Sequence, residues 1–242
     1  MTGARKLTIF DWGLIAGVTV CSSALAISDM AKGDGMDWLG ITSAITGVFC
    51  VVLVAHGNLW NYLFGLVNVT TYAYISYKSN LLGDCLLNLL YYLPMQFYGF
   101  YVWTRRRNVE DKTLAVRRMP MRKRAAIMAA SLAVVALFGF ILSMLKARAA
   151  EGSVIEEFHL YSQYPYRDAL TTIFSIVAQY LLSRAYMEQW HYWIVMNVFS
   201  ILIWISFMIS GTPHAIFMVV MYAFYLINAF RGLAIWSSLA HD

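Results

Sequence analysis

Two tryptophans and an asparagine, Trp190, Trp193 and Asn197, share one face of a predicted helix within a strongly apolar stretch. Positions i, i+3 and i+7 of an α-helix lie on the same side, so two indole rings and one carboxamide point in one direction. Indoles offer flat surfaces for stacking and for cation–π attraction, and the amide both donates and accepts hydrogen bonds. This combination suits a flat heteroaromatic ligand that carries amide or hydroxyl groups. The same spacing recurs earlier, at Asn61, Phe64 and Asn68.

The depth of the two asparagines in their predicted helices favours a shared cavity. Asn68 and Asn197 lie about ten and nine residues from the helix starts, which at about 1.5 Å per residue is near the middle of a membrane. An amide at that depth is costly unless it is paired or hydrated. The alternative is that both amides only bond to neighbouring helices. Trp193 has core packing as its alternative, and Trp190 has the aromatic belt at the membrane interface.

Further polar residues extend this expected site. Asn88, Tyr92 and Gln96 recur every four residues and share one helix face, with Gln96 the deepest. For Asn88, an interhelical hydrogen bond is an equal alternative. Thr172 and Ser175 join from another helix, with bonds to their own backbone as the alternative. The expected substrate-binding residues are Trp190, Trp193, Asn197, Asn61, Asn68, Phe64, Gln96, Tyr92, Asn88, Thr172 and Ser175.

Patterns for catalysis and metal binding are missing from the sequence. It has no HExxH, Walker or GxSxG motif and no His/Cys cluster, so we expect neither an enzyme nor a bound metal or cofactor. The three cysteines lack metal-ligand spacing and a secreted disulfide pattern. Asp37 and Asp168 are interpreted as helix N-caps and Asp84 as a cap or an outer-face charge, so no carboxylate is expected deep in a span. Coupling to protons or sodium is therefore not expected.

The composition is that of a membrane protein. Of 242 residues, 60% are hydrophobic and 13% charged, whereas soluble domains have about 25% charged residues. The mean hydropathy is +0.61. A bilayer core requires roughly 20 helical residues, and eight segments qualify: 8–28, 36–55, 58–78, 84–104, 123–146, 166–183, 188–209 and 213–236. The first segment has a signal peptide as its alternative, because an Ala-Leu-Ala sequence ends it, but Asp11 interrupts its apolar run and favours an extra helix.

The distribution of lysine and arginine predicts the topology. An even number of helices places both termini on one side, which then holds thirteen basic residues against five on the other. Basic loops stay in the cytoplasm, so we expect both termini there. The basic loop at 105–122 is interpreted as this signal, with contact to anionic lipid, and not as a nucleic-acid site. The longest outer loop, 147–165, is expected to be a short surface helix or a lid.

The chain contains an internal repeat joined by one linking helix. Tyr92, Gly99 and Trp103 have counterparts at identical spacing in Tyr225, Gly232 and Trp236. Three helices reverse the chain direction, so one linker makes two copies parallel, as in SWEET transporters. The expected fold class is an all-α polytopic membrane helix bundle of eight transmembrane helices arranged 1+3+1+3. Its expected divisions are an extra N-terminal helix and loop (1–35), a first repeat (36–104), a basic cytoplasmic loop (105–122), a linker helix (123–146), an outer loop (147–165), a second repeat (166–236) and a C-terminal tail (237–242).

Three motifs carry a family resemblance over about 36–236. They are Asn61-Tyr-Leu-Phe-Gly-Leu-Val-Asn68, Tyr98-Gly-Phe-Tyr-Val-Trp103 and Trp190-His-Tyr-Trp193-Ile-Val-Met-Asn197. Together they resemble the PnuC family of bacterial nicotinamide riboside transporters. The resemblance implies a SWEET-like seven-helix core in the bacterial inner membrane, with substrate contacts at both asparagine motifs. It also implies uptake of nicotinamide riboside down its gradient, and a cytoplasmic riboside kinase that traps the nucleoside for NAD synthesis.

We therefore expect a facilitative transporter whose two three-helix bundles rock about a site at the midplane. Thiamine or another vitamin or nucleoside is the alternative cargo within the same fold. A membrane enzyme, a sensor or a purely structural subunit is disfavoured, because no nucleophile, base or metal set is visible and two matched walls suggest a cavity. Expected partners are nicotinamide riboside, membrane lipid and, functionally, the kinase, but no nucleic acid. The aromatic exterior and the resemblance favour a homo-oligomer, with a trimer as the expected assembly.

Overall fold

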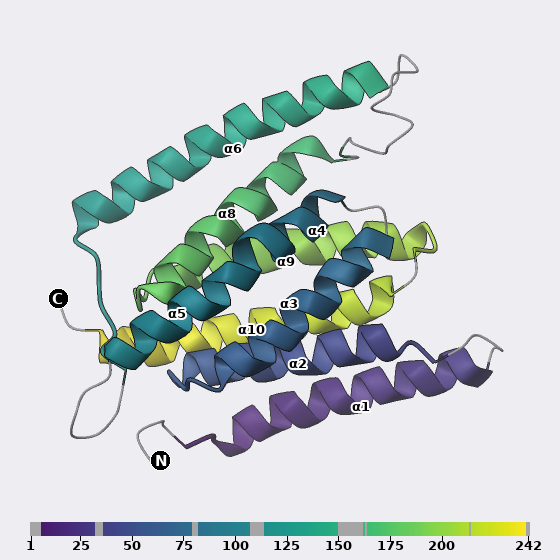
Figure 1. Ribbon diagram of the computed structural model, residues 1–242, viewed down its shortest axis with the longest axis horizontal. Coiled ribbons are helices and arrows are strands. Elements are labelled where there is room, and N and C mark those ends of the chain that lie inside the picture. The colour runs from purple at the N-terminus through teal and green to yellow at the C-terminus, as the bar shows by residue number, and fades with distance from the viewer. Residues whose placement is uncertain are drawn as a thin grey trace.

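The computed structural model describes residues 6–31, 36–78, 82–106, 114–149, 162, 164–212 and 214–240. Helices form nearly all of this part of the chain and lie side by side in one bundle (Figure 1). In order they are α1 (Ile9–Ala31), α2 (Trp38–Ala55), α3 (Asn61–Lys78), α4 (Leu82–Leu87), the π-helix η1 (Asn88–Tyr92), α5 (Leu93–Arg105), α6 (Met121–Ala149), α8 (Pro165–Ser183), α9 (Gln189–Ile209) and α10 (Ala215–Leu239).

The two ends of the bundle differ in charge. The start of α1 and the end of α10 lie at the same end (Figure 1), which we call the basic end. Its described basic residues are Lys6, Arg105, Arg106, Arg117, Arg118, Arg122, Lys123, Arg124, Arg184 and Arg231. The other end, where α4, α8 and α10 begin, is called the opposite end.

The eight predicted segments correspond to these helices, counting α4, η1 and α5 as one. The boundaries differ slightly: α1 continues to Ala31, α6 spans Met121–Ala149, and α10 runs on to Leu239 through the start of the expected tail. The expected lid or surface helix at 147–165 falls mostly on 150–161 and 163, outside the described residues, as does 107–113 of the basic loop.

The fourth predicted segment is a single helix with an irregular middle. The N–H of Leu93 donates to the carbonyl of Asn88, five residues back, as in a π-helix. Pro94 supplies a sequence reason, because it lacks an N–H and its ring clashes with the carbonyl four residues earlier in a regular helix. Widening the turn has a useful consequence. In a regular α-helix, residues four positions apart differ in direction by about 40°. The wider turn of the π-helix reduces this difference, so residues spaced by four stay closer to one side of the helix.

Asp168, expected as a cap, and Asp84, expected as a cap or an outer-face charge, lie inside their helices instead. Asp37 is the N-cap of α2, as predicted, and accepts the N–H of Gly40 at 2.8 Å. The cap prediction for Asp168 is wrong, because α8 begins at Pro165 with Tyr164 in the N-cap position. Asp84 likewise lies within the first turn of α4. Side chains of the first turn project sideways from a helix, so both carboxylates are free to face a neighbouring space.

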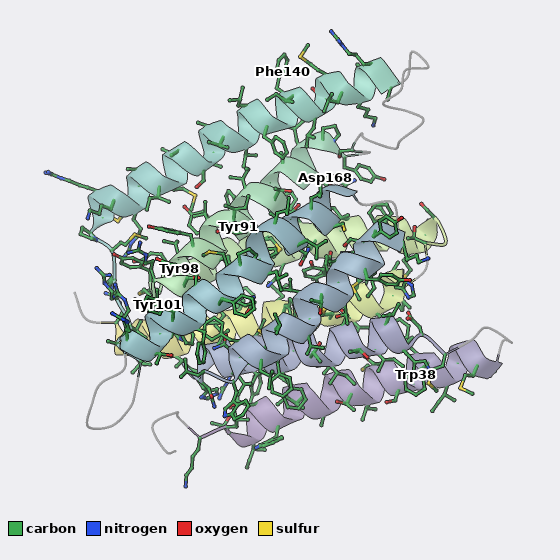
Figure 2. All side chains as sticks on the ribbon, viewed as in Figure 1. Trp38, Tyr91, Tyr98, Tyr101, Phe140 and Asp168 are labelled. Carbon is green, nitrogen blue, oxygen red and sulfur yellow. The ribbon has the colours of Figure 1, made fainter. Side chains whose placement is uncertain are left out.

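The bundle has the outer surface and helix composition of a multi-pass membrane protein. Among the described residues, five helices are long and apolar enough to cross a membrane: α1, α2, α6, α9 and α10. Aromatic side chains point outward from the bundle (Figure 2), with Trp38 67%, Phe140 54% and Tyr101 53% exposed. Such a surface suits contact with lipid. The remaining helices are more polar, and many of their polar side chains line the cavity described below.

The helices pack in two groups that are joined crosswise. α2 packs against α3, and α9 packs against both α8 and α10. Between the groups, α2 lies against α10 and α5 lies against α8. On the flanks, α1 covers α2 and α10, and α6 runs along α8 (Figure 1). The space between the two groups is therefore bounded on all sides by helices.

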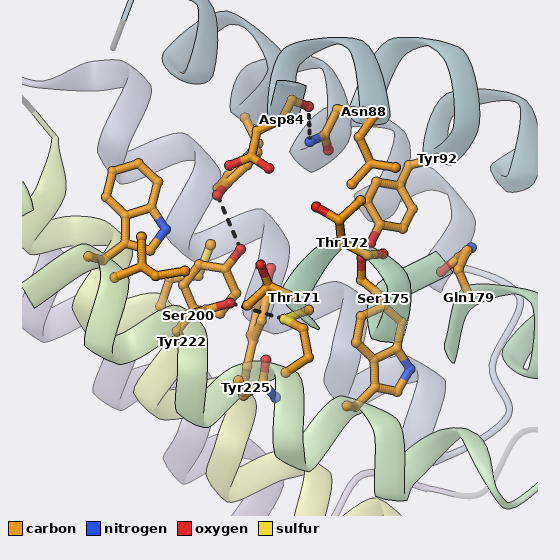
Figure 3. Close-up of a pocket in the computed structure, with 18 of the residues that line it drawn as sticks. Asp84, Asn88, Tyr92, Thr171, Thr172, Ser175, Gln179, Ser200, Tyr222 and Tyr225 are labelled. Carbon is orange, nitrogen blue, oxygen red and sulfur yellow. Dashed lines mark hydrogen bonds between the residues drawn. The ribbon is translucent and has the colours of Figure 1, made fainter. Parts of the chain in front are cut away.

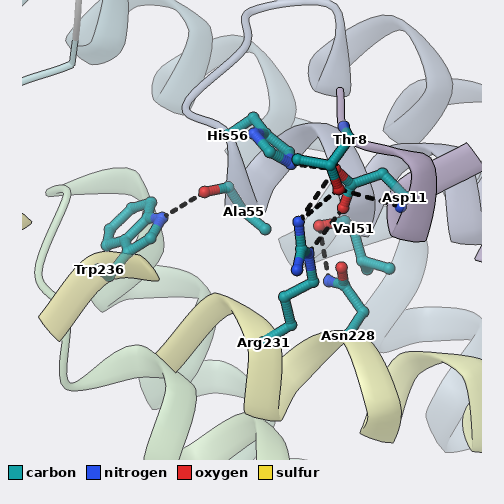
Figure 4. A network of polar contacts seen from close by, with 8 residues as sticks. All are labelled: Thr8, Asp11, Val51, Ala55, His56, Asn228, Arg231 and Trp236. Carbon is teal, nitrogen blue, oxygen red and sulfur yellow. Dashed lines mark hydrogen bonds and ion pairs between the residues drawn. The ribbon is translucent and has the colours of Figure 1, made fainter. Parts of the chain in front are cut away.

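A buried carboxylate fastens α1 to the bundle at the basic end (Figure 4). Asp11 is 0% exposed and accepts hydrogen bonds from Arg231 Nε at 2.8 Å and from the Thr8 N–H at 2.6 Å. His56 Nε2 lies 2.8 Å from the same carboxylate. Arg231 belongs to α10, and His56 directly follows α2. A buried charge is tolerated only when it is paired and hydrogen-bonded, so this network joins three helices.

Candidate substrate-binding site

A cavity of about 720 Å³ lies between the two helix groups. Its walls come from α2, α3, the α4–η1–α5 helix, α8, α9 and α10, with Phe138 and Leu142 contributed by α6. Small-molecule sites typically enclose about 300–1,000 Å³ and combine apolar walls with a few polar groups. This cavity has both properties.

Nine of the eleven predicted site residues line the cavity: Asn68, Asn88, Tyr92, Gln96, Thr172, Ser175, Trp190, Trp193 and Asn197. Asn61 and Phe64 do not line it. Asn61 is the first residue of α3, and its amide donates to the carbonyl of Asn58 at 2.5 Å. Phe64 stacks on Phe49 of α2, with ring centres 4.9 Å apart. Of the three predicted residues of the first-half motif, only Asn68 lines the cavity, together with Gly65 of the same motif.

The two asparagines play different structural parts. Asn68 Nδ2 donates to the carbonyl of Ser43 at 2.8 Å, and its Oδ1 accepts from the hydroxyl of Tyr225 at 3.4 Å. It thereby links α3 to α2 and α10. Asn197 is only 2% exposed, yet its Oδ1 has no hydrogen-bond partner among the described residues. A buried polar atom without a partner costs about 1–3 kcal/mol and calls for an explanation, which a bound ligand would supply.

Two tryptophans of α9 form an aromatic wall beside Asn197. Trp190 is 2% exposed, and its indole N–H has no partner in the part of the chain that the structure describes. Its ring lies against Gly232 of α10, where any side chain would overlap it, and edge-on to Trp236 with ring centres 5.8 Å apart. Trp193 is half-buried, and its Nε1 donates to Gln189 Oε1 at 3.4 Å. The wall thus has a fixed ring and a more accessible one.

The facing wall is polar and comes from α8 and the irregular fourth helix. In Figure 3, Tyr92 points toward Ser175, and Asn88 lies one turn from it. Asn88 Nδ2 donates to the carbonyl of Asp84 at 2.8 Å, and Ser175 Oγ donates to the carbonyl of Thr172 at 2.9 Å. Bonds to their own helices therefore occupy part of the capacity of these two side chains.

Sequence reasoning missed several lining residues, although helical spacing contains their signal. Asp84 precedes Asn88 by the same four residues that separate Asn88 from Tyr92. The step from Asn197 leads on to Ser200 and Trp204 on the same face of α9. Asp84 and Asp168 were left out of the predicted site because they were interpreted as residues at helix ends. The lining residues not predicted include Asp84, Asp168, Gln179, Ser200, Trp204, Tyr222 and Tyr225.

The cavity is closed at the basic end and extends toward the opposite end. At the basic end its lining stops at Val54, Leu182 and Trp190. Beyond them lies a buried cluster that contains Tyr62, Trp103, Trp236, Leu114, Val116 and Met187. Toward the opposite end, the lining reaches residues beyond the helix termini, namely Ser162, Tyr164, Ser210 and Thr212.

A polar and aromatic cavity between two helix groups of a membrane bundle, closed at one end, is typical of a transporter of small molecules. The family described as "Nicotinamide mononucleotide transporter" matches residues 37–238. The chain belongs to this family, whose members are transporters and not enzymes.

Individual relatives and a solved structure agree with this membership. Proteins named "Nicotinamide riboside transporter PnuC" from Neisseria mucosa and Haemophilus influenzae are 35% and 36% identical over 206 and 202 residues. These matches cover 84% of this chain, and 73% and 80% of the two relatives. A structure described as "Crystal structure of the Vitamin B3 transporter PnuC" has a TM-score of 0.77 and 31% identity, covering 97% of this chain and 93% of the other. The protein is thus a multi-pass membrane protein of a bacterial transporter family.

Proposed function

We propose that this protein carries nicotinamide riboside across the bacterial inner membrane by facilitated diffusion. The observation that carries the proposal is the wall of Trp190, Trp193 and Asn197, with its unpartnered amide oxygen. The ring of nicotinamide riboside is flat and cationic, and its carboxamide and ribose hydroxyls donate hydrogen bonds. Indole faces attract such a ring, and a buried oxygen accepts such donors. Relatives about one-third identical bear the name of this activity.

The proposed substrate contacts are the nine predicted residues that line the cavity. Trp190 and Trp193 stack on the ring, while Asn197 and Gln96 bond to the carboxamide or ribose. The other proposed contacts are Asn68, Asn88, Tyr92, Thr172 and Ser175. Asn61 and Phe64 are excluded from the proposal by their positions.

Two parallel three-helix repeats, α2–α5 and α8–α10, are the proposed architecture, with α6 as the linker and α1 as an extra helix. Matching turns support it. After α2, Gly57 has φ 63° and the N–H of Asn58 bonds to the carbonyl five residues back; after α8, Ala185 has φ 58° and Tyr186 makes the same bond. A left-handed alanine is unusual, so its occurrence at the position equivalent to a glycine indicates a conserved turn geometry.

Reciprocal contacts between the halves support a twofold relation. Trp103 Nε1 of α5 donates to the carbonyl of Leu182, near the end of α8, at 3.0 Å. Trp236 Nε1 of α10 donates to the carbonyl of Ala55, at the end of α2, also at 3.0 Å. In each half, the third helix therefore contacts the end of the first helix of the other half. Such a pair of contacts is suited to opening and closing the basic end by rocking of one half against the other.

The orientation completes the proposed cycle. We place the basic end and both termini in the cytoplasm, because basic residues gather there. The present conformation, closed at the basic end, then faces outward and receives the cargo. After closure of the opposite end, the cargo leaves into the cytoplasm, where a riboside kinase traps it for NAD synthesis. A homo-oligomer, with the trimer as the expected form, remains part of the proposal.

Calorimetry on the purified protein tests the cargo. We expect micromolar or tighter binding of nicotinamide riboside and no binding of thiamine or riboflavin. Binding of thiamine without binding of the riboside would keep the proposed site but change the cargo. Thiamine is the second candidate cargo because it is also a cationic heteroaromatic compound. Silence with all three compounds would overturn the proposal. A protonophore should leave equilibration of the riboside across proteoliposome membranes unchanged, since no coupling is proposed.

Substitution of the aromatic wall tests the site. Trp193→Ala and Asn197→Ala should each abolish riboside uptake, because they remove the stacking surface and the free amide oxygen. Phe64→Leu is the matched control, since Phe64 carries the same motif position in the first half but lies outside the cavity, and its uptake should persist. Uptake by both cavity variants at the wild-type rate would contradict the assignment.

A further inference from the structure

We infer that Asp84 and Asp168 select the charge of the cargo, admitting a cationic ring and repelling an anionic phosphate ester in the outer part of the cavity. The inference rests on the proposed function and deepens it. It concerns the choice between a riboside and its 5′-phosphate as cargo. The description of the family names the mononucleotide, whereas the names of the individual relatives give the riboside.

The two carboxylates come from different halves of the bundle and meet at one cavity. Asp84 lies in the first turn of α4 and Asp168 in the first turn of α8, and both belong to the cavity lining. Figure 3 shows the carboxylate of Asp84 directed toward Tyr222, across the cavity from its own helix, and Figure 2 marks Asp168 at the start of α8. Any molecule that passes from the opposite end to Trp193 moves through their field.

Neither carboxylate has a cation bound to it in the part of the chain that the structure describes. By contrast, Asp11 pairs with Arg231, Asp37 with His214 and Glu188 with Arg124. Asp168 accepts a hydrogen bond from the hydroxyl of Ser162. Arg167 influences Asp168 electrostatically but makes no ion pair with it, and its guanidinium lies 3.5 Å from the ring centre of Tyr164.

A structural role explains how these charges are tolerated but not why they face a cavity. Carboxylates in the first turn of a helix are stabilised by the free N–H groups there. That stabilisation needs no cavity, whereas ionisable residues that face a cavity in a membrane protein usually mark a substrate pathway. An independent sign of a ligand lies in the same cavity. Asn197 and Trp190, both 2% exposed, line this cavity, and Oδ1 of the first and Nε1 of the second have no hydrogen-bond partner among the described residues. The cavity thus combines acceptors, indole faces and uncompensated negative charge.

This combination matches a permanently cationic ring and opposes a phosphate. The riboside carries a positive pyridinium, and its dihydro form has nearly the same shape without the charge. The 5′-phosphate ester adds about 1.5 to 2 negative charges at pH 7. Two carboxyl groups without an ion-pair partner among the described residues, in a cavity of low dielectric constant, therefore favour the cationic compound over the neutral one and disfavour the phosphate ester.

Binding of these three compounds to charge-neutral variants tests the inference. The variants are Asp84→Asn, Asp168→Asn, their double variant and Asp37→Asn. Asparagine keeps the size of aspartate and one acceptor oxygen, but replaces the other oxygen with an NH2 donor and removes the charge. Asp37→Asn is the matched control, because it removes a carboxylate from the same end of the bundle at a helix start outside the cavity lining. Monodispersity in detergent and thermal unfolding confirm that each variant is folded.

We expect the double variant to bind the cationic riboside about tenfold more weakly or worse, to bind the dihydro form within about twofold of wild type, and to bind the 5′-phosphate more tightly. Asp37→Asn should match wild type with all three. Equal loss for the cationic and neutral ribosides would show that the carboxylates only support the fold and would overturn the inference, as would unchanged binding of all three. If wild type binds thiamine and no riboside, the proposed cargo fails, and the same variants are then compared with cationic thiamine against a neutral analogue. If wild type binds none of these compounds, both proposals fall.

Discussion

At the scale of single residues, some cavity-lining side chains form hydrogen bonds to neighbouring helices, whereas others have polar atoms without a partner among the described residues. Asn68 and Asn197 occupy the same position in their motifs, so sequence spacing does not distinguish them. Asn68 forms hydrogen bonds to two neighbouring helices, whereas Oδ1 of Asn197 has no partner among the described residues. Helical spacing placed nine of the eleven predicted residues on the cavity wall because the lining follows helix faces, but most of the lining residues were not predicted. It misplaced Asn61 because that residue starts its helix, where the side chain bonds to the preceding turn.

The difference between the two asparagines predicts opposite effects on stability. Asn68→Ala should lower the unfolding free energy of the ligand-free protein by about 0.6–1.7 kcal/mol for each interhelical bond lost. Asn197→Ala should leave it unchanged or raise it, since a buried oxygen without a partner is removed. Thermal unfolding in detergent without substrate measures both. Equal destabilisation by the two substitutions would mean that Asn197 is also held by its neighbours.

At the scale of helices, apolar length and spacing predicted the eight helical segments of the described residues, counting α4, η1 and α5 as one. Five of them are long and apolar enough to cross a membrane. The same pattern could not predict η1. That segment is a backbone response to Pro94, and it keeps Asp84, Asn88, Tyr92 and Gln96 on one side of an irregular helix. It also could not predict how α1 joins the bundle, because the partners of Asp11 are distant in sequence.

Substitution of Asp11 and Arg231 measures how much the attachment of α1 contributes to the unfolding free energy. Asp11→Ala and Arg231→Ala should each reduce the unfolding free energy by about 3 kcal/mol, because each leaves a buried or half-buried charge without its partner. The double variant should lose less than the sum, since neither charge remains alone. Thr19→Ala, on the same helix but bonded only to its own backbone at Ile15, is the control and should stay within about 0.5 kcal/mol of wild type. Strictly additive losses would show that the two side chains act independently.

At the scale of the whole molecule, the two halves are held together by contacts that mirror one another. Trp103 and Trp236 occupy equivalent places and reach the end of the partner half's first helix over equal distances of 3.0 Å. The identical spacing of Tyr, Gly and Trp in the two halves favours the proposed repeat, and the two matched contacts support it. The crosswise pairing itself could not be predicted, because the residues that accept these bonds contribute only backbone carbonyls, which carry no sequence signal.

Equivalence of the two tryptophans predicts matched effects on access from the basic end. Trp103→Phe and Trp236→Phe each remove one hydrogen bond worth about 0.5–1.5 kcal/mol, so each should raise the open population roughly two- to twelve-fold. The readout is modification of Cys50, which lines the cavity, by a membrane-impermeant thiol reagent in inside-out vesicles, with Cys21 and Cys85 replaced by serine.

Substrate should slow that modification in both variants. Trp38→Phe, whose indole is 67% exposed on the outer surface, should behave as wild type. An effect from one of the two tryptophans only would argue against a twofold mechanism.

The pairing of Asp11 with Arg231 also has a consequence for how the chain is made. The carboxylate enters the membrane with α1, and its guanidinium arrives only with α10, after every other described helix has been synthesised. Until then, the nascent chain can offer this carboxylate the N–H of Thr8 and the ring of His56, but not the guanidinium. A polypeptide that stops before Arg231 lacks the bond between α1 and α10, so its first helix should be held less firmly than that of the finished chain. Faster proteolysis of α1 in a chain truncated before Arg231 is the expected result.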